Sequence, residues 1–149
     1  MKVGEICTRE VIVAQKGDSL LEAARSMREF HVGSVVVVQQ LQGKNVPVGI
    51  VTDRDILIET VAEDLSAKTL SVEDIMVSDL ATACEDDDLF DTIRLMRSKG
   101  VRRMPIVDRR GALVGLLALD DVLEFLSQEI RELAQVGARG QEKEARLRS

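Results

Sequence analysis

The chain repeats itself once, with an offset of 69 residues. Under this shift Ile6 aligns with Ile75, and residues 25–28 align with 94–97. After a loop that is three residues longer in the first copy, residues 49–56 align with 115–122. Two copies exclude a solenoid, which needs at least three repeats. Because a unit of about 60 residues buries too little surface to be stable alone, the sequence predicts a pseudo-symmetric pair that shares one core.

Both copies predict the same order of elements. A short apolar strand comes first, at 11–13 and at 80–83, and a helix follows that begins after Ser19 or Asp88. Each copy then has a hairpin around a Gly-containing turn, with strands 34–39 and 48–51, and 103–108 and 113–117. A second helix begins near Thr52 and near Asp120. The first helix is expected to bury one face, made of Leu20, Ala23, Ala24, Met27 and Phe30.

These elements predict three segments: a first repeat at 1–64, a second repeat at 69–130, and an extension at 131–149. A polar linker at 64–69 joins the repeats. The last helix of the second repeat continues through Leu133, and we expect Gly137 and Gly140 to break it. The charged residues after the break are expected to be a loose tail.

Composition narrows the function classes. The net charge of −6, with no Trp or Tyr and three Phe, disfavours nucleic-acid binding, which requires cations and stacking rings. No apolar run approaches the ~20 residues that span a bilayer, and no signal peptide is evident, so a cytoplasmic protein without membrane contact is expected. Two cysteines and one histidine make a zinc site or a catalytic thiol improbable, and Cys7 and Cys84 are interpreted as small apolar filler. The acidic run at 85–88 is interpreted as a turn that places acid at a helix N-terminus.

The junction between hairpin and second helix carries the strongest functional signal, in Gly-Ile-Val-Thr-Asp-Arg-Asp at 49–55. Here a helix N-terminus faces outward and suits a phosphate, Thr52 can donate to a phosphate oxygen, and Asp55 can accept from ribose hydroxyls. A capping box between Thr52 and Asp55 explains the same residues without a ligand. In the second copy Ala118 replaces the threonine while Asp121 is retained, which slightly favours a ligand role for the aspartate.

The two copies resemble a pair of cystathionine-β-synthase (CBS) domains, the arrangement called a Bateman module. The resemblance covers roughly residues 3–130 and depends on residues 49–56, on Arg-Arg-Met-Pro-Ile-Val-Asp at 102–108, and on the two-copy layout. The chain, as a pair of repeats without a further domain in the sequence, resembles the free-standing prokaryotic signalling proteins of this family. The resemblance implies an α+β fold in which two β-α-β-β-α units pack as one module, with two clefts between them that take AMP, ADP, ATP, S-adenosylmethionine or NAD.

The resemblance also implies two sets of site residues. The first cleft would use His31, Val32, Gly33, Ser34, Thr52, Arg54 and Asp55, with Ala81 from the other repeat. The second would use Val101, Arg102, Arg103, Pro105, Ala118 and Asp121, with Thr8 and Ile12 from the other repeat. His31 could equally be a polar loop residue. Because side chains alternate along a strand, only one of Arg102 and Arg103 is expected to face a ligand.

The leading functional hypothesis is a regulatory module that binds an adenosine-containing ligand and signals to an unidentified protein partner. The alternative is a dimerisation scaffold with vestigial clefts. No nucleophile, base or metal cluster predicts an enzyme, and neither a cofactor nor a metal is expected. The apolar residues of the last helix predict a homodimer, because large exposed apolar patches usually mark interfaces.

Overall fold

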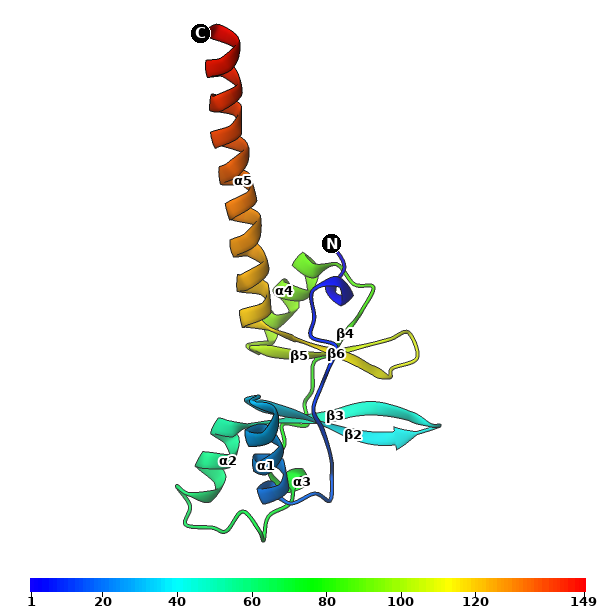
Figure 1. Cartoon of the computed structure of the whole chain (residues 1–149). Coiled ribbons are helices and arrows are strands. Elements are labelled where there is room, and N and C mark those ends of the chain that lie inside the picture. The colour runs from blue at the N-terminus through cyan, green and yellow to red at the C-terminus, as the bar shows by residue number, and fades with distance from the viewer.

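Two three-stranded sheets, one per repeat, form the centre of the computed structural model, which describes residues 1–149 (Figure 1). The first repeat contains η1 (Val3–Glu5), β1 (Val13–Gln15), α1 (Leu20–Phe30), β2 (Ser34–Leu41), β3 (Lys44–Thr52) and α2 (Asp53–Thr60). The second contains α3 (Val72–Ile75), β4 (Ala83–Cys84), α4 (Leu89–Lys99), β5 (Arg103–Val107), β6 (Leu113–Ala118) and α5 (Leu119–Arg148). In each sheet the first strand pairs parallel with the second, which pairs antiparallel with the third. The predicted α+β class with two β-α-β-β-α units is confirmed.

Local sequence signals place the helix starts correctly. The hydroxyl of Ser19 accepts the Glu22 N–H at 3.1 Å, and the carboxylate of Asp88 accepts the N–H groups of Phe90 and Asp91 at 3.0 and 3.2 Å. These side chains satisfy donors that the first helical turn leaves unpaired.

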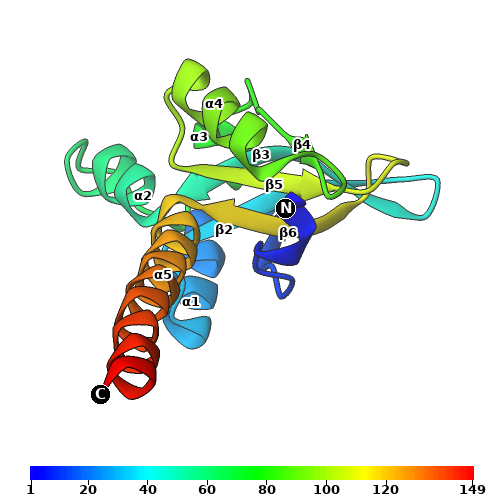
Figure 2. The same ribbon diagram turned by 90° about the horizontal axis from the view of Figure 1, so that it is seen from above.

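The two hairpins lie beside each other, with both turns at the same end of the molecule (Figure 2).

Four predictions of local structure were wrong. The first strands begin later than expected, at Val13 and Ala83. Phe30 is 52% exposed, because it is the last residue of α1 and extends past the sheet that buries Leu20, Ala23 and Met27. Gly137 and Gly140 do not break α5, which continues to Arg148, so no loose tail follows them. A glycine inside a helix costs about 1 kcal/mol relative to alanine, and this cost does not by itself end a helix.

The two repeats exchange their leading segments. Residues before β1 bridge to the second repeat, where the N–H of Thr8 donates to the carbonyl of Leu116 at 2.9 Å. The residues before β4 bridge to the first repeat, where the N–H of Val77 donates to the carbonyl of Ile50 at 3.1 Å. Val3 and Cys7 therefore belong to the core of the second repeat, and Val72 belongs to the core of the first. Neither core is complete without the other repeat.

A glycine in each hairpin makes this exchange possible. A β-carbon at Gly115 would lie 2.6 Å from Cys7 Sγ and 3.1 Å from the carbonyl oxygen of Thr8. At the equivalent Gly49, it would lie 2.6 Å from Met76 Sδ. Cys7 is thus the apolar filler that its sequence position predicts, and burial raises the pKa of its thiol.

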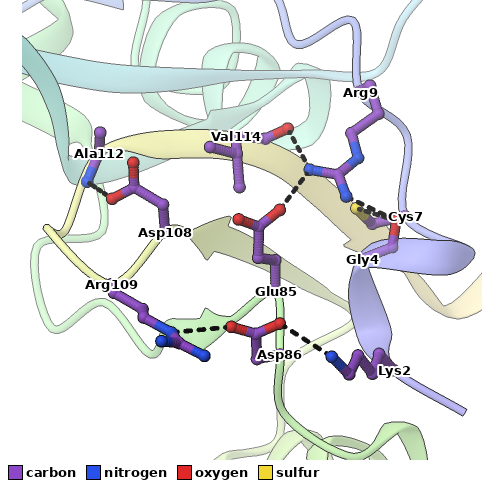
Figure 3. Close-up of polar contacts among 10 residues, drawn as sticks. All are labelled: Lys2, Gly4, Cys7, Arg9, Glu85, Asp86, Asp108, Arg109, Ala112 and Val114. Carbon is purple, nitrogen blue, oxygen red and sulfur yellow. Dashed lines mark hydrogen bonds and ion pairs between the residues drawn. The ribbon is translucent and has the colours of Figure 1, made fainter.

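Ion pairs also hold the first leading segment to the second repeat (Figure 3). Arg9 Nη1 lies 2.9 Å from Glu85 Oε2, and Asp86 accepts from Lys2 Nζ at 3.3 Å and from Arg109 Nε at 3.0 Å. The hydrogen bond from Lys2, and then that from Arg109, lowers the pKa of Asp86 below its usual value. Glu85 and Asp86 of the acidic run therefore pair with the leading segment of the first repeat. The last residue of the run, Asp88, caps α4 as predicted.

Replacing Gly115 by alanine is expected to destabilise the fold by about 1–3 kcal/mol, because the new methyl group would lie 2.6 Å from Cys7 Sγ and 3.1 Å from the backbone carbonyl oxygen of Thr8. Gly49→Ala should cost less, since its nearest neighbours are side-chain atoms of Met76, which can change rotamer. Urea denaturation of both variants measures the difference.

Gly17→Ala is the matched control, because a β-carbon at Gly17 meets no atom within 4 Å. Its stability should equal or slightly exceed that of the parent. A Gly115→Ala protein as stable as Gly17→Ala would show that the two repeats do not depend on this close approach.

The Asp86 ion pairs predict a pH dependence. Because the folded-state pKa of Asp86 is lowered, its stabilising effect is complete above about pH 5 and is lost as the pH falls through the lowered pKa. Asp86→Asn should therefore lower the urea midpoint at pH 6 and have little effect near pH 2. Asp79→Asn removes an exposed carboxylate that makes no ion pair, and it should leave the midpoint unchanged at pH 6. Equal midpoints for parent and Asp86→Asn at pH 6 would contradict the assignment.

Candidate functional site

A cleft of about 440 Å³ lies where the two repeats meet, at the end of β3. We call it the Thr52 cleft. From the first repeat it is lined by Ile50, Thr52, Asp53, Arg54 and Asp55, and from the second by Val77, Val101, Arg102 and Arg103. Its volume falls within the range of small-molecule sites, about 300–1,000 Å³. The cleft therefore combines a hydroxyl, carboxylates, arginines and apolar side chains from both repeats.

Thr52 and Asp55 form a reciprocal capping box at the start of α2. The N–H of Thr52 donates to Asp55 Oδ2 at 2.9 Å, and the N–H of Asp55 donates to Thr52 Oγ1 at 3.1 Å. The capping interpretation of this motif is thus confirmed, but it occupies only one carboxylate oxygen. Asp55 Oδ1 makes no hydrogen bond and can accept one from a ligand.

The N-terminus of α2 does not offer the free N–H groups that the sequence predicted for a phosphate. The N–H of Asp53 donates to the carbonyl of Gly33 at 3.0 Å, and the N–H of Arg54 donates to Asp53 Oδ1 at 2.8 Å. Since the N–H of Asp55 is also capped, the first turn is already satisfied. Any phosphate in this cleft must be held mainly by side chains, and the arginines are the available cations.

A second, smaller cleft of about 220 Å³ lies at the start of α5, and we call it the Ala118 cleft. Arg102 and Arg103 line it together with Ala118, Leu119 and Asp120. Alanine offers no side-chain acceptor, and no side chain caps the N–H groups of Asp120 or Asp121. Two arginines beside a weakly capped helix N-terminus favour an anion.

Asp121 lies in neither cleft. Its Oδ2 accepts the N–H of Ala118 at 3.0 Å, so it caps α5 as Asp55 caps α2. Its side chain lines a separate hollow of about 430 Å³ between η1 and α5, where Met1, Glu5 and Glu124 also lie. The resemblance grouped Asp121 with Arg102 and Arg103, but Asp121 lines a hollow that neither arginine lines.

The remaining predicted residues lie around the clefts without lining them. His31 ends α1 with a left-handed backbone, at φ 54°, and Val32 is exposed. Gly33 lies at the rim of the Thr52 cleft, since a β-carbon there would be 3.2 Å from Arg103 Nη2 and 3.4 Å from Asp53 Oδ2. The others are held in the strands or cores: Ser34 and Pro105 are buried, Ile12 and Ala81 pack against the two cores, and Thr8 bridges to β6.

Arg102 and Arg103 line both clefts, which differs from the prediction in two respects. The sequence assigned them only to the second cleft, but they also line the Thr52 cleft together with Ile50 and Thr52 at the end of β3. The sequence also allowed only one of them to face a ligand. Strand alternation does not apply, because β5 begins at Arg103 and Arg102 precedes it.

Sequence reasoning missed several lining residues, namely Ile50, Asp53 and Val77 in the Thr52 cleft, and Leu119 and Asp120 in the Ala118 cleft. The sequence could have predicted one of them. The offset of 69 residues that pairs Ile12 with Ala81 also pairs Thr8 with Val77, so naming Thr8 implied Val77.

The Thr52 cleft holds three arginines and two aspartates, so its side chains carry a net positive charge within a chain of net charge −6.

The family profile for the CBS domain matches residues 3–62 and 72–128. The chain belongs to the CBS domain family. An uncharacterised protein of Methanopyrus kandleri, MK0525, is 37% identical over 124 residues, which are 83% of this chain and 62% of that protein. The chain thus spans less than two thirds of the length of this relative.

Solved CBS structures share the fold. A CBS domain protein from Pyrobaculum aerophilum, complexed with AMP, superposes with a TM-score of 0.72 at 26% identity, covering 81% of this chain and 89% of that one. The CBS domain pair of protein MJ0100, in complex with 5-methylthioadenosine and S-adenosyl-L-methionine, has a TM-score of 0.72 at 25% identity, with 85% and 99% covered. These CBS pairs therefore bind adenosine-containing molecules. No helix of the present chain is sufficiently long and apolar to cross a bilayer.

Proposed function

We propose that this protein is a regulatory module that binds an adenosine-containing ligand in the Thr52 cleft and transmits its occupancy to a protein partner. The observation that carries the proposal is the composition of this cleft, where Asp55 of one repeat faces Arg102 and Arg103 of the other. Binding of AMP, S-adenosyl-L-methionine and 5-methylthioadenosine by similar CBS pairs supports the ligand class.

In the proposed complex each repeat contributes one part of the recognition. The free Oδ1 of Asp55 accepts from the ribose hydroxyls, and Thr52 remains its capping partner. Ile50, Val77 and Val101 supply apolar surface for the adenine ring. The guanidinium groups of Arg102 and Arg103 pair with phosphate oxygens, which a planar fork of donors matches well.

Such a ligand would connect the two repeats, and this provides a route to regulation. Bound across the cleft, it would favour one relative position of the repeats over others, since a ligand shifts an equilibrium toward the conformation it binds more tightly. No group of three or more Cys, His, Asp or Glu side chains is placed to hold a metal ion.

The alternative is a scaffold in which the clefts are vestigial. It is favoured by one observation: the capping box satisfies Thr52 and half of Asp55 without any ligand. The two functions differ in whether a change at the free oxygen of Asp55 affects binding.

Asp55→Asn tests the ribose contact while keeping the cap, because the amide oxygen of asparagine can still accept the N–H of Thr52. Losing the charged acceptor should cost about 1.5–3 kcal/mol, or roughly ten- to hundredfold in affinity for AMP. Titration calorimetry measures it, and Asp121→Asn, which changes the equivalent cap outside the cleft, should leave this affinity unchanged. If Asp55→Asn binds AMP as tightly as the parent at equal thermal stability, Asp55 is only a cap.

Arg102→Ala combined with Arg103→Ala should weaken ATP binding much more than S-adenosylmethionine binding, because only ATP carries phosphates for the two guanidinium groups. The matched control is Arg25→Ala with Arg28→Ala, which removes two exposed charges from α1, away from both clefts. It should change neither affinity. Equal losses for the two ligands would show that the arginines hold the repeats together and do not bind phosphate.

A further inference from the structure

Most of α5 lies outside the globular body of the protein. The helix runs from Leu119 to Arg148, and it projects away from both sheets (Figures 1 and 2). Phe125 and Leu126 are its last residues to pack against the core of the second repeat, and every residue from 127 onward is exposed. Large apolar side chains are among them, since Ile130 is 67% exposed and Leu133 is 72% exposed.

A helix of this kind needs a partner. Glycine is a weak helix former, yet Gly137 and Gly140 lie inside the projecting segment, where a β-carbon at either position would meet no atom within 4 Å. In proteins most helical stability comes from the packing of an apolar face and not from intrinsic helix propensity. Within this chain nothing covers that face.

The exposed apolar face of α5 follows the spacing of a coiled coil, and Leu126 is the one large apolar member of that face that also packs against the core of the second repeat. Residues at alternating intervals of four and three form one continuous seam, which we call the α5 seam: Leu119, Leu123, Leu126, Ile130, Leu133, Gly137, Gly140, Glu144 and Leu147. The first five members are large and apolar, and the next two are glycines. A seam of this type packs against another helix with the same spacing, and the α5 helix of a second copy of this chain provides one.

The order of residues in the seam decides the orientation of the two helices. In a parallel pair each residue meets its own copy, so glycine would face glycine and Glu144 would face Glu144 inside the seam. In an antiparallel pair centred between Ile130 and Leu133, Gly137 faces Leu126 of the partner subunit. In the same register Gly140 faces Leu123 of the partner subunit, so that each glycine lies opposite a leucine. The antiparallel pair thus fills the space that the glycines leave and separates the two glutamates.

The charges of α5 agree with this orientation. Residues 119–133 carry five carboxylates and one arginine, whereas residues 134–148 carry four basic side chains and two carboxylates. Antiparallel pairing sets the acidic half against the basic half, and it brings Arg139 of the partner subunit beside Glu124. The same asymmetry also matches the helix dipole, so it supports the orientation only together with the glycine positions.

The hollow beside η1 would receive the basic end of the partner helix. It is lined by Glu5, Asp121 and Glu124, next to the part of α5 that carries Leu123. Leu123 is 54% exposed and available for contact. In the antiparallel register Lys143 of the partner subunit lies opposite Asp120, at the edge of this acidic hollow.

We propose that two copies of this chain associate through antiparallel pairing of α5, with Ile130 and Leu133 at the centre and the basic end of each helix against the acidic start of the other. The interface uses residues 119–148 and leaves the Thr52 cleft open. It is therefore independent of whether the cleft binds a nucleotide.

The first experiment measures mass by light scattering after gel filtration. The parent, of 16.4 kDa per chain, should be a dimer at micromolar concentration, and Ile130→Asp with Leu133→Asp should be a monomer with an unchanged melting temperature for the globular body. Gln135→Asp with Ala138→Asp places the same two charges, three residues apart, on the opposite face of the helix and should remain a dimer. A monomeric parent, or a dimeric Ile130→Asp/Leu133→Asp variant, overturns the proposal.

The second experiment determines orientation by disulfide trapping in a Cys84→Ala background, where the remaining Cys7 is buried. Leu123→Cys protein is mixed with a larger, tagged Gly140→Cys protein and oxidised mildly. Antiparallel pairing predicts a covalent heterodimer in the mixture and little crosslinking of either protein alone. Efficient crosslinking of Leu123→Cys to itself, or of Gly140→Cys to itself, would indicate a parallel pair and overturn the proposed orientation.

Discussion

The close approach of each leading segment to a glycine of the other repeat is the interaction on which this structure depends. Cys7 packs on Gly115, and Met76 packs on Gly49, at distances that no β-carbon would allow. Each contact places apolar side chains from one repeat in the core of the other. A repeat of this size is marginal alone, and the exchange gives the pair one cooperative structure in place of two weak ones.

The same exchange creates the Thr52 cleft. Val77 reaches the cleft because it belongs to the segment that crosses to the first repeat, where it pairs with Ile50. Arg102 and Arg103 reach it because the paired repeats bring the start of β5 to the end of β3. The proposed ligand site is therefore a product of the interface between repeats, and a change in their relative position would alter it directly. This coupling is what a regulatory module requires.

Asp55 illustrates how one residue can have a structural role without losing the capacity for a second. One carboxylate oxygen caps α2, which fixes the side chain in position, and the other makes no hydrogen bond, while the residue lines the Thr52 cleft. Asp121 caps α5 in the same way but faces a different hollow. The two repeats thus retain the same local structure at this position while differing in what the carboxylate can reach.

The sequence alone determined the duplication, the order of elements, the helix caps at Ser19 and Asp88, and the capping box between Thr52 and Asp55, because these depend on neighbours close in the chain. It did not determine that Arg103 lies against Gly33, that Phe30 stays exposed, or that Asp121 turns away from the arginines. It also misjudged Gly137 and Gly140, since local propensity alone does not determine where a helix ends. These features depend on contacts between residues far apart in the sequence, and only the packing of one repeat against the other decides them.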